Sequence, residues 1–475
     1  MIFRQLHDDE AQGGAYLWCG QTCSLGLTHR LHHIVNQSLD RPIKSFDPFR
    51  FLSQYGFVCQ KDRPNHSLLS QDVTGNIDII ALLGSLSKRA VWCERYMASA
   101  LEALIAANFA RRLAEVTGIL LLLVGLTRSY NPAIGLGPQQ EVESINPKMG
   151  VHTRLTDEVE EWKIKRTLTM VREMGASWIV EYFPWAYIEP RKGHFDWQHA
   201  DMVVNHALAQ GLTVIARLGM VPEWARPEET VASYLDEEHL DDFGDFVYAF
   251  VRHFHGRVKH FIIWNEPNLS FEWGFRPPDP EGYTKLLKLA YLRAKEADPE
   301  CLVLAAGLAP TLAGEDDPWG MSDLVFLERM YSWGAKDYFD LMAIHAYGLR
   351  APPDEAPSEG RINFRRAELI HQIMASNGDE GKRAVITEGG WNDHPRWTKA
   401  VRPSQRIEYT IRAYDKALKD WEWCQAVALW QFRTARPSNT YHDYFTFVTA
   451  DFFPKPLYLE VQISAQGAGR EGAGR

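Results

Sequence analysis

The segment Lys259-His-Phe-Ile-Ile-Trp-Asn-Glu-Pro-Asn268 runs from an apolar strand into a polar turn. Glu266 is the first acidic residue after the apolar run, and Pro267 ends the strand because proline has no backbone N–H to give to a sheet. The segment Arg383-Ala-Val-Ile-Thr-Glu-Gly-Gly-Trp391 places Glu388 in the same position relative to its own apolar run. The chain therefore carries two carboxylates at the ends of two predicted strands.

Downstream of residue 148, short apolar or β-branched runs alternate with longer amphipathic stretches. Two of these stretches, Asp157–Met174 and Glu281–Ala297, have the three-to-four-residue spacing of a helix. Strands are predicted to begin near Met149, Ser177, Leu212, Val258, Cys301, Phe339, Arg383 and Cys424.

Strands that alternate with helices indicate a parallel sheet with right-handed crossovers. Eight such units over about 310 residues predict an α/β protein with a (β/α)8 TIM barrel, which we place at residues 149–465. A doubly wound open sheet is the alternative, but no Gly-x-Gly-x-x-Gly turn follows the first strand and no phosphate loop is found, so a nucleotide cofactor is not indicated. In a barrel, Glu266 and Glu388 would point into one mouth from nearly opposite sides.

Composition narrows the class of protein. The chain has 475 residues, of which 45% are hydrophobic and 24% charged, as in soluble globular proteins. Lys and Arg total 51 against 61 Asp and Glu, so the formal net charge is 51 − 61 = −10. This charge disfavours a nucleic-acid partner, because phosphate backbones are bound by basic surfaces.

The six cysteines do not form the framework of a small disulfide-rich protein. Cys301 and Cys424 lie in apolar runs and are predicted to be buried. The cysteine and histidine residues near the N-terminus match no established zinc spacing, so no metal site is predicted there; they are Cys19, Cys23, His29, His32 and His33.

An apolar run from Leu113 to Thr127 follows Arg111 and Arg112. It is shorter than the roughly 20 residues of a membrane span but fits the hydrophobic region of a signal peptide. We expect translation to start near Met97, which makes residues 1–96 an N-terminal extension and 97–128 an export signal or uncleaved membrane anchor. A buried helix is the alternative. Residues 129–148 are predicted to be a linker and 466–475 a disordered tail.

The ends of the two glutamate-bearing strands, together with two earlier loops, carry a family resemblance. Trp264-Asn265-Glu266-Pro267-Asn268 and Thr387-Glu388-Gly389-Gly390-Trp391 resemble the strand-four and strand-seven signatures of the clan A retaining glycoside hydrolases, which include cellulase-like and β-xylosidase-like enzymes. The segments Trp185–Trp197 and Pro222–Trp224 are similar to that clan's early loops. The resemblance covers roughly residues 149 to 460.

The resemblance implies the roles of the two glutamates. Glu266 would be the acid/base and Glu388 the nucleophile of a double displacement, which requires two carboxyl groups about 5 to 5.5 Å apart. Glu388 must be ionised, so cationic or hydrogen-bond-donating neighbours are expected; Arg217 and Tyr347 are the candidates. Arg217 has an alternative partner in Glu181. A structural ion-pair network is the alternative for the two glutamates themselves.

Further substrate-binding residues are expected around the same mouth. Asn265 would donate to a sugar hydroxyl, His345 and Tyr347 resemble the His-x-Tyr that lines the reactive subsite in this clan, and Trp430 would lie beneath the sugar. Trp185 is a candidate wall for a neighbouring subsite. Packing roles are the alternatives for these residues. The acidic run 236–242 is more typical of a solvated helix start than of a cation site.

The sequence thus predicts a retaining glycoside hydrolase that cleaves β-linked oligo- or polysaccharides, with no metal and no organic cofactor. A transglycosidase with the same residues and a non-catalytic glycan-binding barrel are the alternatives. The paired carboxylates argue against the second, because binding alone does not require them. With the apolar run as an export signal or membrane tether, the protein is expected to be extracellular or anchored facing outside.

Overall fold

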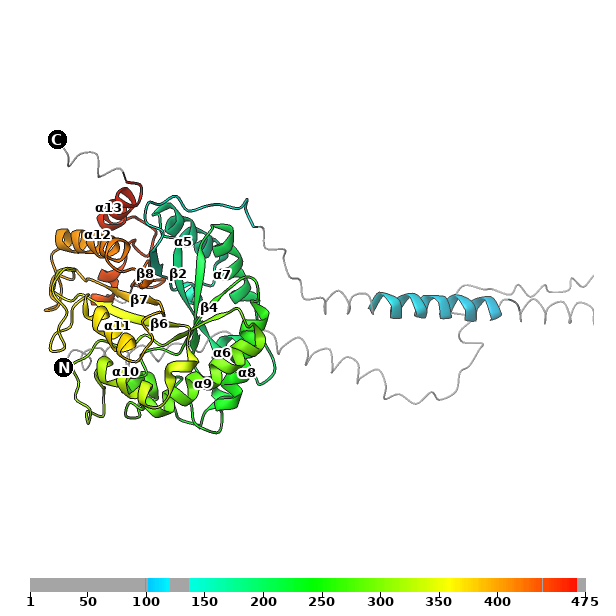
Figure 1. Ribbon diagram of the computed structural model, residues 1–475. Helices are drawn as coiled ribbons and strands as arrows, with labels where there is room; N and C mark the ends of the chain where they lie inside the picture. Colours follow the sequence, from blue (N-terminus) through cyan, green and yellow to red (C-terminus); the bar gives the residue numbers. More distant parts are fainter. Residues whose placement is uncertain (1–98, 100, 120–135, 438, 468–475) are drawn as a thin grey trace, which may run out of the picture. The chain divides into compact units, whose positions relative to one another are not determined.

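The computed structural model describes residue 99 and residues 101–119, 136–437 and 439–467 (Figure 1). The chain divides into two units, Met1–Arg128 and Ser129–Arg475. In the first unit, residues 101–119 form a helix with exposed side chains. The predicted extension 1–96 and the apolar run beyond residue 119 lie outside the described residues. Among the described helices, none is long and apolar enough to cross a membrane.

The second unit is built on a closed barrel of parallel strands in the order β1 to β8, with β8 paired to β1. This confirms the predicted (β/α)8 barrel. Each strand begins within two residues of its predicted start. The strands are β1 (Met149–His152), β2 (Trp178–Pro184), β3 (Thr213–Gly219), β4 (His260–Ile263), β5 (Leu302–Ala305), β6 (Leu341–Tyr347), β7 (Ala384–Gly390) and β8 (Cys424–Leu429).

Helices surround the barrel (Figure 1). The predicted helices are confirmed as α5 and α9, and α9 begins where Asp279 accepts a bond from the Gly282 N–H and Pro280 occupies the first turn. The α-helices are α5 (Glu161–Glu173), α6 (Trp185–Ile188), α7 (Gln198–Ala209), α8 (Leu240–His253), α9 (Pro280–Ala297), α10 (Asp323–Ser332), α11 (Arg366–Ser376), α12 (Pro403–Lys419) and α13 (Pro456–Ala465). The short 3-10 helices are η1 (Leu155–Asp157), η2 (Glu223–Ala225), η3 (Ser270–Trp273), η4 (Ala335–Tyr338) and η5 (Tyr441–Phe445).

Alternate side chains of the strands fill two separate cores. One core joins Val180, Ile215, Ile262, Leu304 and Val385 from different strands, as expected for side chains that point into a closed barrel. The larger core lies between the strands and the helices. The two predicted buried cysteines, Cys301 and Cys424, are buried free thiols, and burial raises the pKa of each to about 12.

The end of the predicted linker packs against the barrel unit. The Gln140 N–H donates to the Ala209 carbonyl at 2.8 Å, and the Ile145 N–H donates to the Ala465 carbonyl at 2.9 Å. Asn146 is buried, and its Nδ2 donates to the Tyr414 carbonyl at 3.1 Å while its Oδ1 accepts the Lys148 N–H at 3.1 Å. Residues 140–148 therefore contribute to the stability of the barrel unit.

We predict that Asn146→Ala lowers the free energy of unfolding by about 1 to 3 kcal/mol, because it leaves a buried carbonyl and a half-buried N–H without their partner. Denaturant unfolding at neutral pH measures the change. Glu141→Ala, an exposed position in the same segment, is the control and should change stability by less than about 0.5 kcal/mol. Equal stability of the two variants would show that the segment does not contribute.

Candidate active site

The strand register places polar side chains at one mouth of the barrel. Ile215 on β3 faces the barrel interior, so Arg217, two residues later, faces the same way. On β6, Ala343 faces the interior and is followed at the same spacing by His345 and Tyr347. The carboxyl ends of all eight strands meet at this mouth, which is where barrel enzymes have their active sites.

Glu388 on β7 is buried among donors from other strands. Arg217 Nη1 donates to Glu388 Oε1, and the Tyr347 hydroxyl donates to Glu388 Oε2 at 2.9 Å. His345 Nδ1 lies 3.8 Å from the same Oε2. The two neighbours predicted for Glu388 are thus both found in contact with it.

Arg217 also determines the orientation of Asn265. Its Nη1 donates to Asn265 Oδ1 at 2.7 Å, which leaves the Asn265 amide nitrogen to donate elsewhere. The alternative partner of Arg217 was Glu181, and that prediction is wrong. Glu181 instead accepts bonds from Thr153 Oγ1 at 2.6 Å and the Leu155 N–H at 2.9 Å, because its side chain points away from the interior of the barrel.

The surroundings of Glu388 favour its ionised form. Burial opposes ionisation, but the His345 imidazole and the Arg217 guanidinium outweigh it and lower the pKa of Glu388 to about 2. Burial and the Glu388 charge raise the pKa of Tyr347 well above its usual value, so this hydroxyl keeps its proton and donates. Glu388 is therefore a carboxylate at neutral pH.

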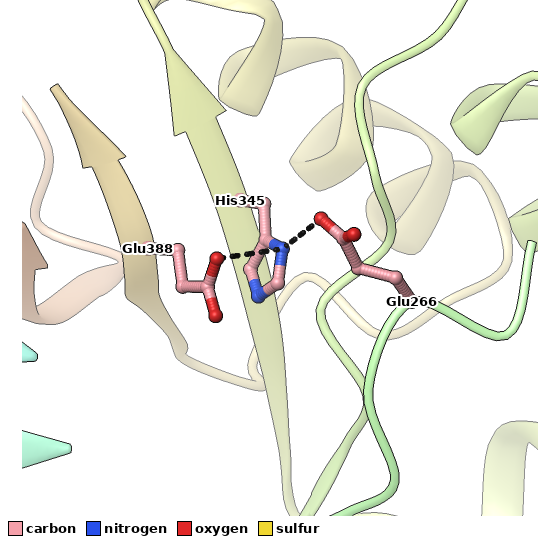
Figure 2. A group of neighbouring side chains, drawn as sticks. All are labelled: Glu266, His345 and Glu388. Carbon is pink, nitrogen blue, oxygen red and sulfur yellow. Dashed lines mark hydrogen bonds and ion pairs between the residues drawn. The ribbon is translucent and has the colours of Figure 1, made fainter. Parts of the chain in front are cut away.

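Glu266 lies across the mouth from Glu388. Its Oε1 is 2.7 Å from His345 Nδ1, and Figure 2 shows the His345 ring between the two glutamates. Glu266 has a φ of 39° and Trp264 a φ of 76°, so the backbone takes left-handed conformations as it leaves β4. Such conformations are strained in residues with a side chain and are concentrated at functional sites.

The two carboxylates are close together. One oxygen of Glu266, one oxygen of Glu388 and a ring nitrogen of His345 all lie within 4.8 Å of one another. These three atoms are also chemically suited to bind a divalent cation. However, both oxygens of Glu388 already accept bonds from Arg217 and Tyr347, which favours a role in direct chemistry on an organic substrate.

His152 is a residue of this mouth that sequence analysis missed. It ends β1, and its Nε2 lies 3.8 Å from Glu388 Oε1. Burial and the Arg217 charge lower its pKa well below the usual value, and neither ring nitrogen has a hydrogen-bond partner among the described residues. Its side chain is only 1% exposed, so it belongs to the buried surroundings of Glu388. Its position at the end of a predicted strand was the available signal.

Trp430 follows β8 and is half-buried beside His152, with ring centroids 4.5 Å apart. The Trp430–Gln431 peptide bond is cis. This arrangement agrees with the predicted location of Trp430 at the mouth. Part of the indole is exposed.

Trp185 cannot line a subsite, so that prediction is wrong. Its side chain is 0% exposed and stacks on Phe246, with ring centroids 5.6 Å apart, while its Nε1 donates to Glu189 at 2.7 Å. Trp185 begins α6 and turns into the core between strands and α8. Aromatic packing against α8 explains its location.

Comparisons with known proteins agree with this geometry. Residues 156–245 match the glycoside hydrolase 42 family model, described as Beta-galactosidase. The matched residues include Arg217 but neither of the two mouth glutamates. No curated protein is significantly similar to the chain.

Several solved structures share the fold. A family 39 glycoside hydrolase from the gut symbiont Bacteroides cellulosilyticus WH2 is 21% identical with a TM-score of 0.55, over 70% of this chain and 66% of that chain. A monomeric beta-xylosidase from Caulobacter crescentus CB15 is 16% identical with a TM-score of 0.51, over 68% of this chain and 69% of that one. GH5_18 from Streptomyces cattleya, solved in complex with GlcNAc, is 15% identical with a TM-score of 0.53, over 69% and 82% of the two chains.

The chain thus spans about two thirds of the length of the first two structures. The structural likenesses establish the (β/α)8 fold and, with the family model, confirm the resemblance to clan A glycoside hydrolases. The family-model match over residues 156–245 agrees with the predicted class of enzyme, a glycosidase. A shared fold does not by itself assign a substrate or a residue's role.

We predict that Arg217→Met moves the acidic limb of the pH dependence of kcat/KM to higher pH by about one unit or more. Removing the guanidinium takes away a charge that favours ionised Glu388, so the pKa of this carboxyl rises from about 2. The profile is measured with an aryl β-glycoside. Arg226→Met, which changes an arginine bound to Thr230, is the control and should leave the limb in place. An unmoved limb in Arg217→Met would refute the assigned interaction.

Proposed function

We propose that the protein is a retaining glycoside hydrolase that cleaves β-glycosidic O-linkages through a covalent glycosyl-enzyme. The observation that carries the proposal is the separation of the carboxylates, whose nearest oxygens lie within 4.8 Å of each other. Retaining enzymes have carboxyl groups about 5 to 5.5 Å apart, whereas inverting enzymes need about 6.5 to 9.5 Å to admit a water between them.

Glu388 is the proposed nucleophile. Its low pKa supports this role, because an attacking carboxylate must be ionised before the substrate reacts. The Arg217 and Tyr347 bonds hold its two oxygens in one orientation. When Glu388 bonds to the anomeric carbon its charge is lost, and Arg217 and Tyr347 are then able to stabilise the carboxylate as it leaves in the second step.

Glu266 is the proposed acid/base. In the first step Glu388 attacks the anomeric carbon, the bond to the leaving oxygen breaks, and that oxygen takes its electron pair and the proton of Glu266. In the second step the Glu266 carboxylate removes a proton from water, whose oxygen bonds to the anomeric carbon and releases Glu388. The bond to His345 Nδ1 supports the role by orienting the Glu266 carboxyl group.

The remaining residues of the mouth would bind the sugar. The Asn265 amide nitrogen, oriented by Arg217, is the proposed donor to a hydroxyl near the reacting carbon. Trp430 would pack under the apolar face of the ring. The matching family model is described as Beta-galactosidase and one similar structure is a beta-xylosidase, so we propose β-D-galactosides and β-D-xylosides as substrates.

We predict that added azide gives opposite products with variants of the two glutamates. Glu388→Gly should abolish turnover, and azide in the vacated space should attack directly to give a glycosyl azide of inverted configuration. Glu266→Ala should still form the covalent intermediate from dinitrophenyl β-D-galactoside or β-D-xyloside, and azide should then give the retained product. Proton NMR of the product distinguishes the two anomers.

The control for this experiment is Glu223→Ala, which changes an exposed acid in the loop after β3 and should hydrolyse the substrate like the wild type without forming an azide product. The same anomer from both glutamate variants would contradict the assignment. Release of the inverted sugar by the wild type would contradict the retaining mechanism.

We further propose that the protein acts outside the cytoplasm, directed by the apolar run after Arg111 and Arg112. Fusing residues 97–128 to a phosphatase that is active only after export should give phosphatase activity in a bacterial host. Replacing Leu121 and Leu122 by arginine should abolish it, since charges disfavour insertion of the hydrophobic region. Equal activity from both fusions would exclude an export role.

A further inference from the structure

The backbone of Glu266 is held by two hydrogen bonds: its carbonyl accepts the Leu269 N–H at 2.9 Å, and its N–H contacts the segment after β5. Its left-handed φ of 39° is not held by the β4 ladder, which ends at Ile263. Instead, the Glu266 N–H donates to the carbonyl oxygen of Gly307 at 3.0 Å. A strained conformation persists only where its surroundings hold it, and Gly307 supplies this support.

The chain two residues after Gly307 is held by the buried side chain of Asn268. Asn268 Oδ1 accepts the Ala309 N–H at 2.9 Å, and its Nδ2 donates to the carbonyls of Ala309 and Met321, each at 2.9 Å. The side chain is 0% exposed. The segment after β5 and the segment that carries Glu266 are therefore joined at Gly307 and again at Ala309.

The side of Gly307 that lacks a Cβ is occupied by His345. A Cβ added to Gly307 would lie 2.3 Å from both Cδ2 and Nε2 of the imidazole, and the three nearest atoms all belong to this ring. The His345 side chain is only 1% exposed, so the ring has no open space to enter. Gly307 does not have a positive φ, so its backbone conformation would accept alanine. Glycine is required here for space.

We propose that Gly307 is a positioning residue for the acid/base. Because it has no side chain, the His345 imidazole can pack against it and contact Glu266, and its carbonyl accepts the Glu266 N–H. The inference rests on the proposed function, because it concerns the acid/base of that reaction. His345 Nδ1 is 2.7 Å from Glu266 Oε1 and 3.8 Å from Glu388 Oε2, so a displaced ring would change the orientation of the acid. The oxygens of Glu388 keep their Arg217 and Tyr347 bonds.

The expected result of Gly307→Ala is a selective loss of general acid catalysis. A phenyl β-glycoside has a poor leaving group and needs the proton from Glu266, so its kcat/KM should fall by about 100-fold. A dinitrophenyl β-glycoside needs little protonation, and its rate of enzyme glycosylation should fall by less than about threefold. Gly314→Ala is the matched control, because a Cβ at this exposed glycine of the same loop has no atom within 4 Å. It should behave as the wild type with both substrates.

A double-mutant cycle separates steric displacement of His345 from a general effect on folding. In the His345→Ala background the ring is absent, so adding Gly307→Ala should change neither rate by more than about twofold. If Gly307→Ala alone fails to fold, the pair Gly307→Ala with His345→Ala should recover a cooperative thermal transition. A double variant that remains unfolded would overturn the proposal.

Two outcomes overturn the positioning role while leaving the proposed function intact. The first is a Gly307→Ala variant with wild-type rates. The second is a Gly307→Ala variant that loses the same factor with phenyl and dinitrophenyl glycosides. Both count against the positioning role when Glu266→Ala does show the leaving-group dependence. If Glu266→Ala itself shows no such dependence, the acid/base role of Glu266 is refuted, and the positioning role with it. Dinitrophenyl and phenyl β-D-galactosides and β-D-xylosides are the probes for every variant.

Discussion

The arrangement of the mouth follows from burying one ionised carboxylate. A buried carboxylate is unfavourable unless positive charge and hydrogen-bond donors surround it. Glu388 meets this condition through Arg217 from β3 and through Tyr347 and His345 from β6. These groups come from strands that are far apart in sequence, so the closed barrel is required to bring them together.

The residues around Glu388 also link the two glutamates to each other. Arg217 contacts both Glu388 and Asn265, which precedes Glu266, and His345 lies between the two carboxyl groups (Figure 2). A change in one member of this network therefore alters the surroundings of the others. Such networks are not additive, and the contribution of one member is measurable only against the removal of its partner.

Many of the buried aromatic residues in the described part of the chain build the wall of the barrel. Trp185 packs on Phe246 of α8, and Phe250 of the same helix contacts Phe183 of β2 with ring centroids 5.3 Å apart. A high content of tryptophan is therefore no measure of the number of sugar-binding rings. At the mouth of the barrel Trp430 is half-buried and contacts His152, with ring centroids 4.5 Å apart.

Sequence was sufficient to predict the eight strands and the positions of Glu266 and Glu388, because apolar runs that end in a polar residue are local patterns. It also identified His345 and Tyr347 by their resemblance to a His-x-Tyr, and both lie at the end of β6. It could not choose Glu388 over Glu181 as the partner of Arg217, since only the closed barrel decides which alternate side chains point inward. Nor could it exclude Trp185 or find His152, because burial and proximity to Glu388 arise from packing between distant segments.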